Sequence, residues 1–231
     1  MDELVSQILQ LLKLCSIEQR EFIFQYLRKE FKIHPIESKL NIEAQIILEA
    51  INKDEKGLTL RMIRGVIAEA AFDIEVVQKR KNWINETPKG DLAYDFLLND
   101  GQGTVSIQVK LQRSQNLIPM SAKQASRRFS EDLFVVETQK TRGGLDKATN
   151  EDTRPYRFGE FDILAVCMQP STGEWSTFYY TLSSWLLPRS ENENLMQKFQ
   201  PVAMNPNEFW TDNFETCVEW LRTGIKKVIP S

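Results

Sequence analysis

The sequence predicts a mixed α/β fold, in which helices flank a β-sheet and a helical arm comes first. Three observations lead to this prediction. Apolar residues recur at helical spacing through most of residues 2–76. Near residue 92 the period changes to two-residue alternation on both sides of a glycine-containing turn. Further short apolar runs and a last amphipathic stretch follow, and this order of elements is typical of a mixed sheet packed by helices.

The N-terminal quarter of the chain is expected to form helices. Residues 2–14 and residues 17–31 both carry apolar side chains on one helical face, although the second pattern is less regular. Ser16 is a plausible N-cap for the second helix. A third helical pattern opens at Asn41.

The next helix is expected to be the first element of the core. Gly57 interrupts the chain, and Thr59 is a plausible N-cap for a helix that runs to about Val76. We therefore divide the chain into a helical arm or subdomain at residues 1–55 and a core with a C-terminal helix at residues 56–231.

An antiparallel hairpin is expected after this helix. Residues 92–98 (LAYDFLL) form a strand candidate, and residues 99–103 (NDGQG) carry the Asp-Gly signal of a tight turn. Residues 104–111 (TVSIQVKL) are the return strand, where apolar and polar residues alternate strictly. Successive side chains of a strand point to opposite faces, so Gln108 and Lys110 are expected to share the polar face.

The rest of the core is expected to contain a helix-like stretch near residues 120–130 and three more strands. The runs LFVVE (133–137) and DILAVCM (162–168) fit central strands, and STFYYTL (176–182) fits a strand nearer an edge. An amphipathic helix rich in Trp and Phe is expected at about residues 207–227.

Composition excludes several classes of protein. The chain has 231 residues, of which 42% are hydrophobic and 26% charged, as in ordinary globular proteins. It has no run near the roughly 20 apolar residues that span a bilayer, and no secretory signal, so a cytoplasmic location is expected. Three scattered cysteines and a single histidine, His34 in an expected loop, argue against a zinc site.

The charge distribution leaves room for a nucleic-acid partner. The net charge of the chain is −3, which by itself argues against one. Residues 110–157, however, carry ten Lys and Arg against six Asp and Glu, a local net charge of +4. Such a region can supply contacts to phosphates, although the same asymmetry also fits a solvated surface.

The hairpin carries the residues that point to a chemistry. Asp95 lies among apolar residues, where a carboxylate is costly unless it is paired or binds a metal. The Asp95 carboxylate and the Val109 carbonyl oxygen are ligands that suit Mg²⁺, and Lys110 can position water and stabilise charge on a phosphate. The pattern therefore predicts metal-assisted phosphodiester cleavage. The alternative is a structural ion pair beside the hairpin.

These residues resemble the motif of the PD-(D/E)xK nuclease superfamily. Asp95 is followed, after twelve residues, by Gln108, Val109 and Lys110, where the family usually has an acid at the position of Gln108. Type II restriction endonucleases with a QxK variant show the same replacement. A second segment, residues 153–166 (TRPYRFGEFDILAV), is similar to one that follows the active-site hairpin in such proteins. The resemblance covers about residues 60–170.

The resemblance implies a restriction-endonuclease-like mixed β-sheet and a site that uses Mg²⁺, with Mn²⁺ as a substitute. The Gln108 amide, in place of the second acid, can offer one oxygen to a metal but no negative charge, which leaves open whether one or two metals bind. It also raises interest in a third carboxylate from the preceding helix, with Glu69 as first choice and Asp73 as second. Asp91, in the loop sequence PKGD, is a rival to Asp95 as the metal-binding aspartate.

Double-stranded DNA is the partner that this resemblance implies. The candidate contacts are polar and basic side chains that follow the hairpin or gather near the second segment. They are Gln112, Arg113, Lys123, Arg127, Arg128, Lys140, Arg142, Arg154 and Arg157. Arginine or glutamine among them would suit guanine or adenine edges in the major groove. For each one, a solvated surface residue is the competing interpretation.

The leading functional hypothesis is a type II restriction endonuclease that cuts a short duplex sequence. It would act as a homodimer, with the helical arm as a candidate interface, or as a monomer that acts twice. It would belong with a cognate DNA methyltransferase that is not a stable partner. A repair nuclease, a nickase or a junction nuclease is the second hypothesis. A catalytically degenerate DNA-binding protein on the same fold is the third, and Gln108 is the residue that supports it.

Overall fold

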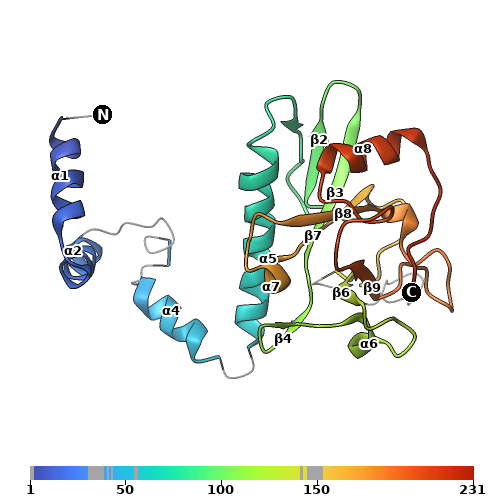
Figure 1. The fold of residues 1–231 in the computed structure, drawn as a ribbon, viewed down its shortest axis with the longest axis horizontal. Coiled ribbons are helices and arrows are strands. Elements are labelled where there is room, and N and C mark those ends of the chain that lie inside the picture. Colours follow the sequence, from blue (N-terminus) through green and yellow to red (C-terminus); the bar gives the residue numbers. More distant parts are fainter. Residues whose placement is uncertain are drawn as a thin grey trace. The chain divides into compact units, whose positions relative to one another are not determined.

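The computed structural model describes residues 3–30, 39–40, 42, 44–54, 57–140, 143–144 and 153–231. The chain divides into two compact units, Met1–Arg61 and Met62–Ser231. The elements of each are labelled in Figure 1. The expected division of the chain at residue 55 remains a prediction, since the boundary between the units falls inside a helix.

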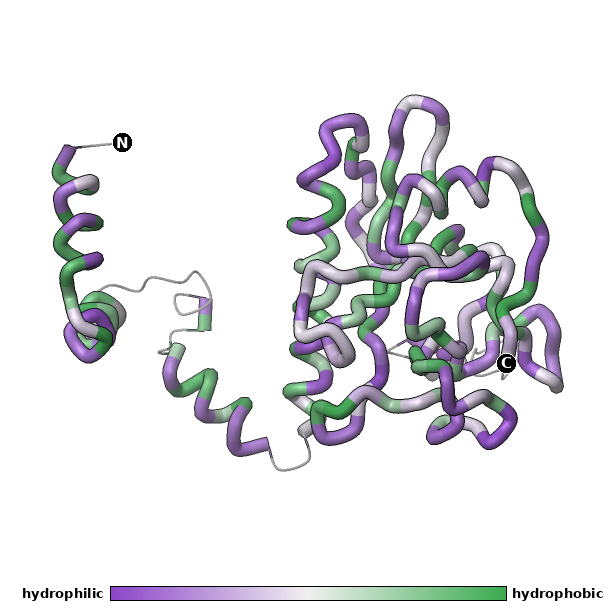
Figure 2. Tube along the Cα trace, viewed as in Figure 1, coloured by the Kyte–Doolittle hydropathy of each residue, from purple (hydrophilic) through white to green (hydrophobic). Residues whose placement is uncertain are grey.

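The first unit contains the helices α1 (Glu3–Leu14), α2 (Ile17–Glu30) and α4 (Ala44–Asn52). The N-cap predicted for α2 is present: Ser16 Oγ accepts from Gln19 N, and Gln19 Oε1 accepts from Ser16 N. None of the described side chains of these helices is buried. Apolar and polar residues alternate along α1 and α4 (Figure 2).

Helix α5 (Leu58–Phe72) continues into a π-helix at Asp73–Val77, close to the predicted end. The cap predicted for α5 was wrong: Thr59 lies inside the helix, and its N–H donates to Asp54 Oδ2 at 2.6 Å. The carboxylate of Asp54 therefore does what was expected of the Thr59 hydroxyl. The buried Phe72 ring lies 5.1 Å from the ring of Phe96, centroid to centroid, and so ties α5 to the sheet.

A five-stranded mixed sheet forms the centre of the second unit, with helices packed around it, and this confirms the predicted fold class. Its order is β1 (Ile84–Asn85), β2 (Phe96–Asn99), β3 (Thr104–Leu111), β7 (Ile163–Cys167) and β8 (Phe178–Leu182). Strand β3 is antiparallel to β2 and parallel to β7. β7 is central and β8 is at the edge, as predicted.

Buried apolar side chains hold this sheet. Val105, Ile107 and Val109 of β3 are all buried, as the alternation predicted. Every residue of β7 and of β8 is buried as well. The side chain of Asp162 joins β3 and β7, because its Oδ2 accepts from the Ser106 N–H at 2.8 Å and from the Ser106 hydroxyl at 2.6 Å.

The predicted central strand at residues 133–137 lies elsewhere. It is β6 (Leu133–Glu137), and it pairs with β9 (Phe199–Ala203) in a separate two-stranded sheet. A single bridge between Gln112 and Val136 connects it to the continuation of β3. A short apolar run indicates that a strand is buried but not which strand it pairs with. The sequence pattern therefore did not distinguish the five-stranded sheet from the β6–β9 sheet.

Three small elements also differ from expectation. A short hairpin joins β4 (Ser114–Gln115) to β5 (Ile118–Pro119) directly after β3. The helix-like stretch near residues 120–130 contains only α6 (Ala122–Ala125), which Ser121 and Gln124 cap. Helix α7 (Gln169–Thr172) and a 3₁₀ turn at Ser183–Trp185 follow β7 and β8.

The C-terminal helix α8 (Phe214–Thr223) is shorter than predicted but ends at Gly224, near the expected position. Asn213 Oδ1 accepts from Thr216 N at 3.0 Å and caps its first turn. The left-handed conformation of Gly224, with φ of 65°, ends the helix. Among the described residues, no helix is both long enough and apolar enough to cross a bilayer.

Candidate active site

Asp95 lies one residue before β2, opposite Gln108 of β3. The predicted strand was longer, but the Asp95 N–H still donates to the Ile107 carbonyl at 2.9 Å and so extends the ladder. Its Oδ2 accepts from the Val109 N–H at 2.7 Å and from Nε2 of Gln108. The carboxylate is thus held against the strand that carries the other two residues of the predicted site.

Gln108 is almost fully buried, with 2% of its surface exposed. Its Nε2 donates both to Oδ2 of Asp95 and to the Val109 carbonyl, the second at 3.2 Å. The Gln108 amide N–H group therefore lies between the Asp95 carboxylate and the Val109 carbonyl oxygen. Rotation of the amide by half a turn would place Oε1 there instead, and the nitrogen and oxygen of an amide are distinguished only by their partners.

Lys110 extends from the same strand, and the Tyr156 ring packs against its ammonium group. Nζ of Lys110 lies 5.3 Å from the ring centroid, and Nζ of Lys140 lies 5.4 Å from the same centroid. The ring is 3% exposed and meets Phe161 edge-on at 5.3 Å. An aromatic face attracts cations, so Tyr156 supports the charged form of Lys110 and limits its position.

Glu69 of α5 joins the same charge cluster. Burial raises the pKa of Glu69, and the negative charge of Asp95 raises it further, whereas Lys110 opposes the shift. Burial also raises the pKa of Asp95, against the effects of the Lys110 ammonium and the Val109 N–H. Glu69 was the first choice for a third carboxylate. Asp73 instead lies in the π-helix and accepts from Gln78 Nε2 at 2.7 Å.

The ammonium of Lys110 is affected in the opposite sense. Burial lowers the pKa of Lys110, and the carboxylates of Asp95, Glu69 and Glu137 partly restore it. The described residues show no hydrogen bond from Nζ of Lys110 to another side chain, so its donors can face a substrate. Asp91, the rival aspartate, is exposed in the loop before β2, and its charge raises the pKa of Tyr156 after the larger effect of burial.

The donor set suits a hard divalent cation. Oxygens of Asp95 and Val109 converge on one point, the Gln108 amide supplies a third oxygen after rotation, and Glu69 lies within electrostatic range. No cluster of three or more His, Cys, Asp and Glu side chains gathers as a metal site within the described ranges. The oxygens available to a metal here therefore belong to the carboxylates of Asp95 and Glu69, the Gln108 amide and the Val109 carbonyl.

Two of the predicted DNA contacts are engaged within the protein. Gln112 is 1% exposed, and its Oε1 accepts from Ser171 N at 3.1 Å, so it is not available to DNA and this prediction is corrected. Gln112 directly follows β3, bridges to Val136 of β6 and bonds to Ser171 in the segment after β7, and a local pattern does not reveal such distant partners. Arg113 forms an ion pair with Glu137, and its guanidinium lies 5.8 Å from the Phe199 ring.

The other predicted contacts have different surroundings. Lys140 pairs with Glu160 at 2.7 Å beside Tyr156. Lys123 pairs with Glu131 at 2.8 Å at the surface. The remaining described candidates, which are all exposed, are Arg127, Arg128, Arg154 and Arg157. Arg142 and the loop histidine His34 lie outside the described residues.

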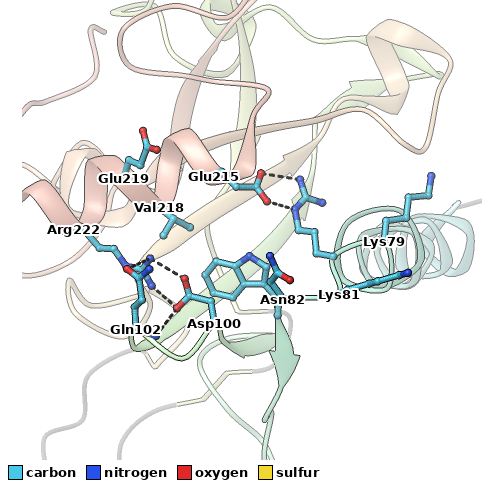
Figure 3. Close-up of a pocket in the computed structure, with 11 residues that line it drawn as sticks. Lys79, Lys81, Asn82, Asp100, Gln102, Glu215, Val218, Glu219 and Arg222 are labelled. Carbon is cyan, nitrogen blue, oxygen red and sulfur yellow. Dashed lines mark hydrogen bonds and ion pairs between the residues drawn. The ribbon is translucent and has the colours of Figure 1, made fainter.

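A hollow of about 650 Å³ lies at the opposite end of the β2–β3 hairpin, between its turn and α8. Figure 3 shows that opposite charges face each other across it. Arg80 pairs with Glu215 at 2.7 Å, and Arg222 pairs with Asp100 at 2.7 Å. These two pairs use four of its charged groups, and none of the lining residues belongs to the Asp95 cluster. The hollow therefore contains none of the residues of the predicted site.

Sequence reasoning missed Tyr156, Glu137 and Glu160. Tyr156 lies within the second segment that resembles restriction enzymes, and it is the one aromatic residue between Arg154 and Arg157. Its position in that segment was the feature of the sequence that could have identified Tyr156 as a site residue. Glu137 and Glu160 were not detectable, because each acts on the site through a lysine or arginine that is distant in the sequence.

Comparisons with known proteins add little to this description. No family model matches the chain, and no curated protein matches it. Among solved structures, the bacterial homing endonuclease I-Ssp6803I is similar over 71% of this chain and 94% of its own, with 18% sequence identity and a TM-score of 0.40. At this TM-score and identity, the likeness defines neither the fold nor the activity of the chain.

Proposed function

We propose that the protein is a metal-dependent endonuclease that hydrolyses phosphodiester bonds in double-stranded DNA. The observation that supports this most directly is the convergence of Asp95, Gln108 and the Val109 carbonyl beside Lys110. Oxygen ligands next to a half-buried lysine are what metal-assisted attack on a phosphate requires.

Each residue has a part in this proposal. Asp95, Glu69 and the Gln108 and Val109 oxygens would hold Mg²⁺, or Mn²⁺ in its place. When bound, the ion would supply Lewis-acid activation of the phosphate and of water. Lys110 would orient the attacking water and stabilise the added negative charge on the phosphate.

The surroundings of Lys110 suit this role. Burial lowers its pKa, the carboxylates of Asp95, Glu69 and Glu137 partly restore it, and the Tyr156 ring lies against its ammonium group. In the ammonium form, Lys110 would be a charged donor in a largely buried site. A charged donor in such a site stabilises developing negative charge more strongly than one in water.

The finer form of the proposal is a type II restriction endonuclease of the QxK kind. It rests on the order Asp95, Gln108, Lys110 and on the second segment around Tyr156. A homodimer would cut both strands, and a DNA methyltransferase would protect the host site.

A catalytically degenerate DNA-binding protein is the second candidate. The observation that favours it is the Gln108 amide, which brings no negative charge to the site. Mg²⁺ binding at Asp95 separates the two candidates. A repair or junction nuclease shares the chemistry and differs in the DNA that it cuts.

Plasmid digestion tests the proposal. With Mg²⁺, the full chain is expected to cut a plasmid of known sequence into discrete bands that map a recognition site, and EDTA is expected to prevent this. Lys110→Ala should lower the rate at least about 100-fold, as for loss of a group that stabilises the transition state. Lys226→Ala, which removes an exposed lysine remote in sequence from the site, is the matched control and should cut normally.

Other results would change the assignment. Smearing or nicking that needs Mg²⁺ and Lys110 would favour the repair or junction nuclease. Absence of cleavage of several DNAs with Mg²⁺ and with Mn²⁺ would refute the nuclease, and binding without cleavage would then identify the degenerate protein.

A further inference from the structure

The β4–β5 hairpin has an unusual turn. Ser114 pairs with Pro119 and Gln115 with Ile118, which leaves two residues, Asn116 and Leu117, to form the turn. Both have positive φ, 51° and 65°. Positive φ at both central residues is the type I′ geometry, which normally has glycine at the second position.

Leucine is strained in this position. A side chain larger than hydrogen crowds the backbone in the left-handed region, and glycine or asparagine usually takes such a place. Among the described residues, Asn116 and Leu117 are the ones other than glycine with positive φ. Strain of this kind is concentrated at functional sites, so an observed outlier justifies a functional hypothesis.

The strained turn exposes apolar side chains rather than burying them. Leu117 is 67% exposed and Ile118, its neighbour, is 68% exposed. Burial in the core therefore does not compensate for the strain. Both side chains are therefore accessible to a partner of the protein.

The base of the hairpin is joined to the elements that carry the candidate site. On one side, Arg64 of α5 donates to Ser114 Oγ at 3.4 Å. On the other, Arg113 pairs with Glu137, whose charge in turn acts on Lys110. The base of the hairpin is therefore held by the helix of Glu69 and by β6.

Charge around the hairpin favours a polyanion as the partner. The basic residues of positions 110–130 are Lys110, Arg113, Lys123, Arg127 and Arg128, and Glu131 and Asp132 follow them. Arg113 and Lys123 are paired with Glu137 and Glu131, so the positive charge that faces a partner comes from Arg127 and Arg128. Arg127 and Arg128 are exposed. An apolar tip in a basic segment fits a DNA duplex, whose phosphates surround stacked apolar bases, better than an acidic or purely apolar protein surface.

We propose that Leu117 and Ile118 form a wedge that enters the DNA duplex between neighbouring base pairs. The inference rests on the proposed nuclease function and adds how the enzyme deforms its substrate. Apolar side chains inserted between base steps unstack and kink the duplex, and the strained turn would hold them ready for insertion.

The wedge lies within reach of a cleavage position. Seven residues separate Lys110 from Leu117. An extended chain covers at most about 3.5 Å per residue, so the tip lies within about 25 Å of the lysine along the hairpin. This is about seven base pairs of B-form DNA at 3.4 Å each. The deformation is therefore expected inside or beside the recognition site.

Unwinding of a plasmid tests the wedge without knowledge of the recognition site. The full chain carrying Lys110→Ala, which should not cleave, is bound to a relaxed plasmid in EDTA, and a metal-independent topoisomerase is added. Insertion should unwind the duplex and lower the linking number, as read on a chloroquine gel. Leu117→Gly or Ile118→Ser in the same background should reduce this change at least about twofold, at equal amounts of bound protein.

The controls separate the wedge from the fold and from the activity. Ile84→Ser removes a matched apolar side chain, 64% exposed on the edge strand β1, and should unwind DNA as the parent does. Leu117→Gly should have a urea midpoint at or above that of the parent, because glycine accepts the φ of 65°. If it fails to fold, Ile118→Ser decides.

Three outcomes are informative against the proposal. Equal unwinding by the parent and by both wedge variants would overturn it. No unwinding by a parent that binds DNA, while the wild type cleaves it, would overturn the wedge and leave the nuclease intact. A wild type that neither binds nor cleaves DNA would overturn both.

Discussion

Burial and like charge act together on the carboxylates of the site. Asp95 and Glu69 both have a raised pKa, first through burial and, for Glu69, also through the neighbouring charge. Burial lowers the pKa of Lys110 as well. Each group is thus held where its charged form is less favourable than in water, which is a condition typical of sites built for catalysis or binding.

The first residue-scale prediction concerns stability without metal. A carboxyl whose folded pKa is raised binds its proton more tightly in the folded state, so its contribution to stability is present at low pH. That contribution is lost as pH rises from the ordinary aspartate range through the raised pKa. Asp95→Asn should therefore raise the urea midpoint of the metal-free protein at pH 7, and the gain should shrink as pH falls.

Mg²⁺ gives the same variant a second readout. The ion should stabilise the wild type, because it binds the folded state, but should have no such effect on Asp95→Asn. Asp132→Asn, which alters an exposed aspartate, serves as the control and should respond to Mg²⁺ as the wild type does. Equal responses of Asp95→Asn and the wild type would place the metal elsewhere.

The second residue-scale prediction concerns Tyr156. Its ring favours the ammonium form of Lys110, so Tyr156→Leu should lower the pKa of that lysine further. Cleavage should then decline at a lower pH on the alkaline side of its pH profile. Tyr156→Phe keeps the ring and should keep the wild-type profile.

A control distinguishes this effect from loss of packing. Phe209→Leu removes a ring that lies 5.2 Å from Lys227 Nζ, a pair that is not part of the candidate site. It should leave the pH profile unchanged. An unshifted alkaline limb in Tyr156→Leu would show that the ring only fills space.

At the scale of elements, β3 is the part that assembles the site. Its pairing with β2 brings Asp95 opposite Gln108, and its parallel pairing with β7 buries the apolar face beneath them. Helix α5 adds Glu69, and the continuation of β3 adds the β4–β5 hairpin. Helix α8 carries none of these residues and is expected to contribute stability rather than chemistry.

The element-scale prediction tests that separation at α8. Asn213→Ala removes the acceptor for the Thr216 N–H and should lower the free energy of unfolding by about 1 kcal/mol, measured by urea titration. Asn213→Ser retains a capping oxygen and should recover most of the loss. Both variants should cleave DNA as the wild type does, and a defect in cleavage would mean that α8 supports the site directly.

At the scale of the whole molecule, the buried core lies in the second unit. The buried apolar side chains of the described residues run from Ala68 to Ile229, whereas α1, α2 and α4 bury none. Burial of apolar surface is the main favourable contribution to folding. The second unit therefore contains what it needs to fold.

The whole-molecule prediction is that residues 53–231, which keep the Asp54 cap of α5, unfold cooperatively. Circular dichroism during urea titration would show one transition. If the amphipathic arm helices form the expected dimer interface, light scattering should find the full chain dimeric and the shorter chain monomeric. A shorter chain that remains dimeric would exclude the arm as the interface.

Local pattern alone determined a substantial part of this protein. Strict alternation in residues 104–111 predicted β3 and placed Gln108 and Lys110 on one face, and the Asp-Gly signal predicted the hairpin turn. The mixed α/β fold followed from the change of period after α5. These features are readable because side-chain periodicity is a property of neighbouring residues in one element.

Only the tertiary structure decided the rest. It paired β6 with β9 rather than with the main sheet, buried Gln112 beneath Ser171, and brought Tyr156 to Lys110. The turn of the β4–β5 hairpin was also invisible, because Asn116 and Leu117 lack the glycine that signals such a turn. Contacts between residues distant in the chain determine which strands pair, which polar groups are buried and which pKa values shift. The local periodicity of a sequence does not contain this information.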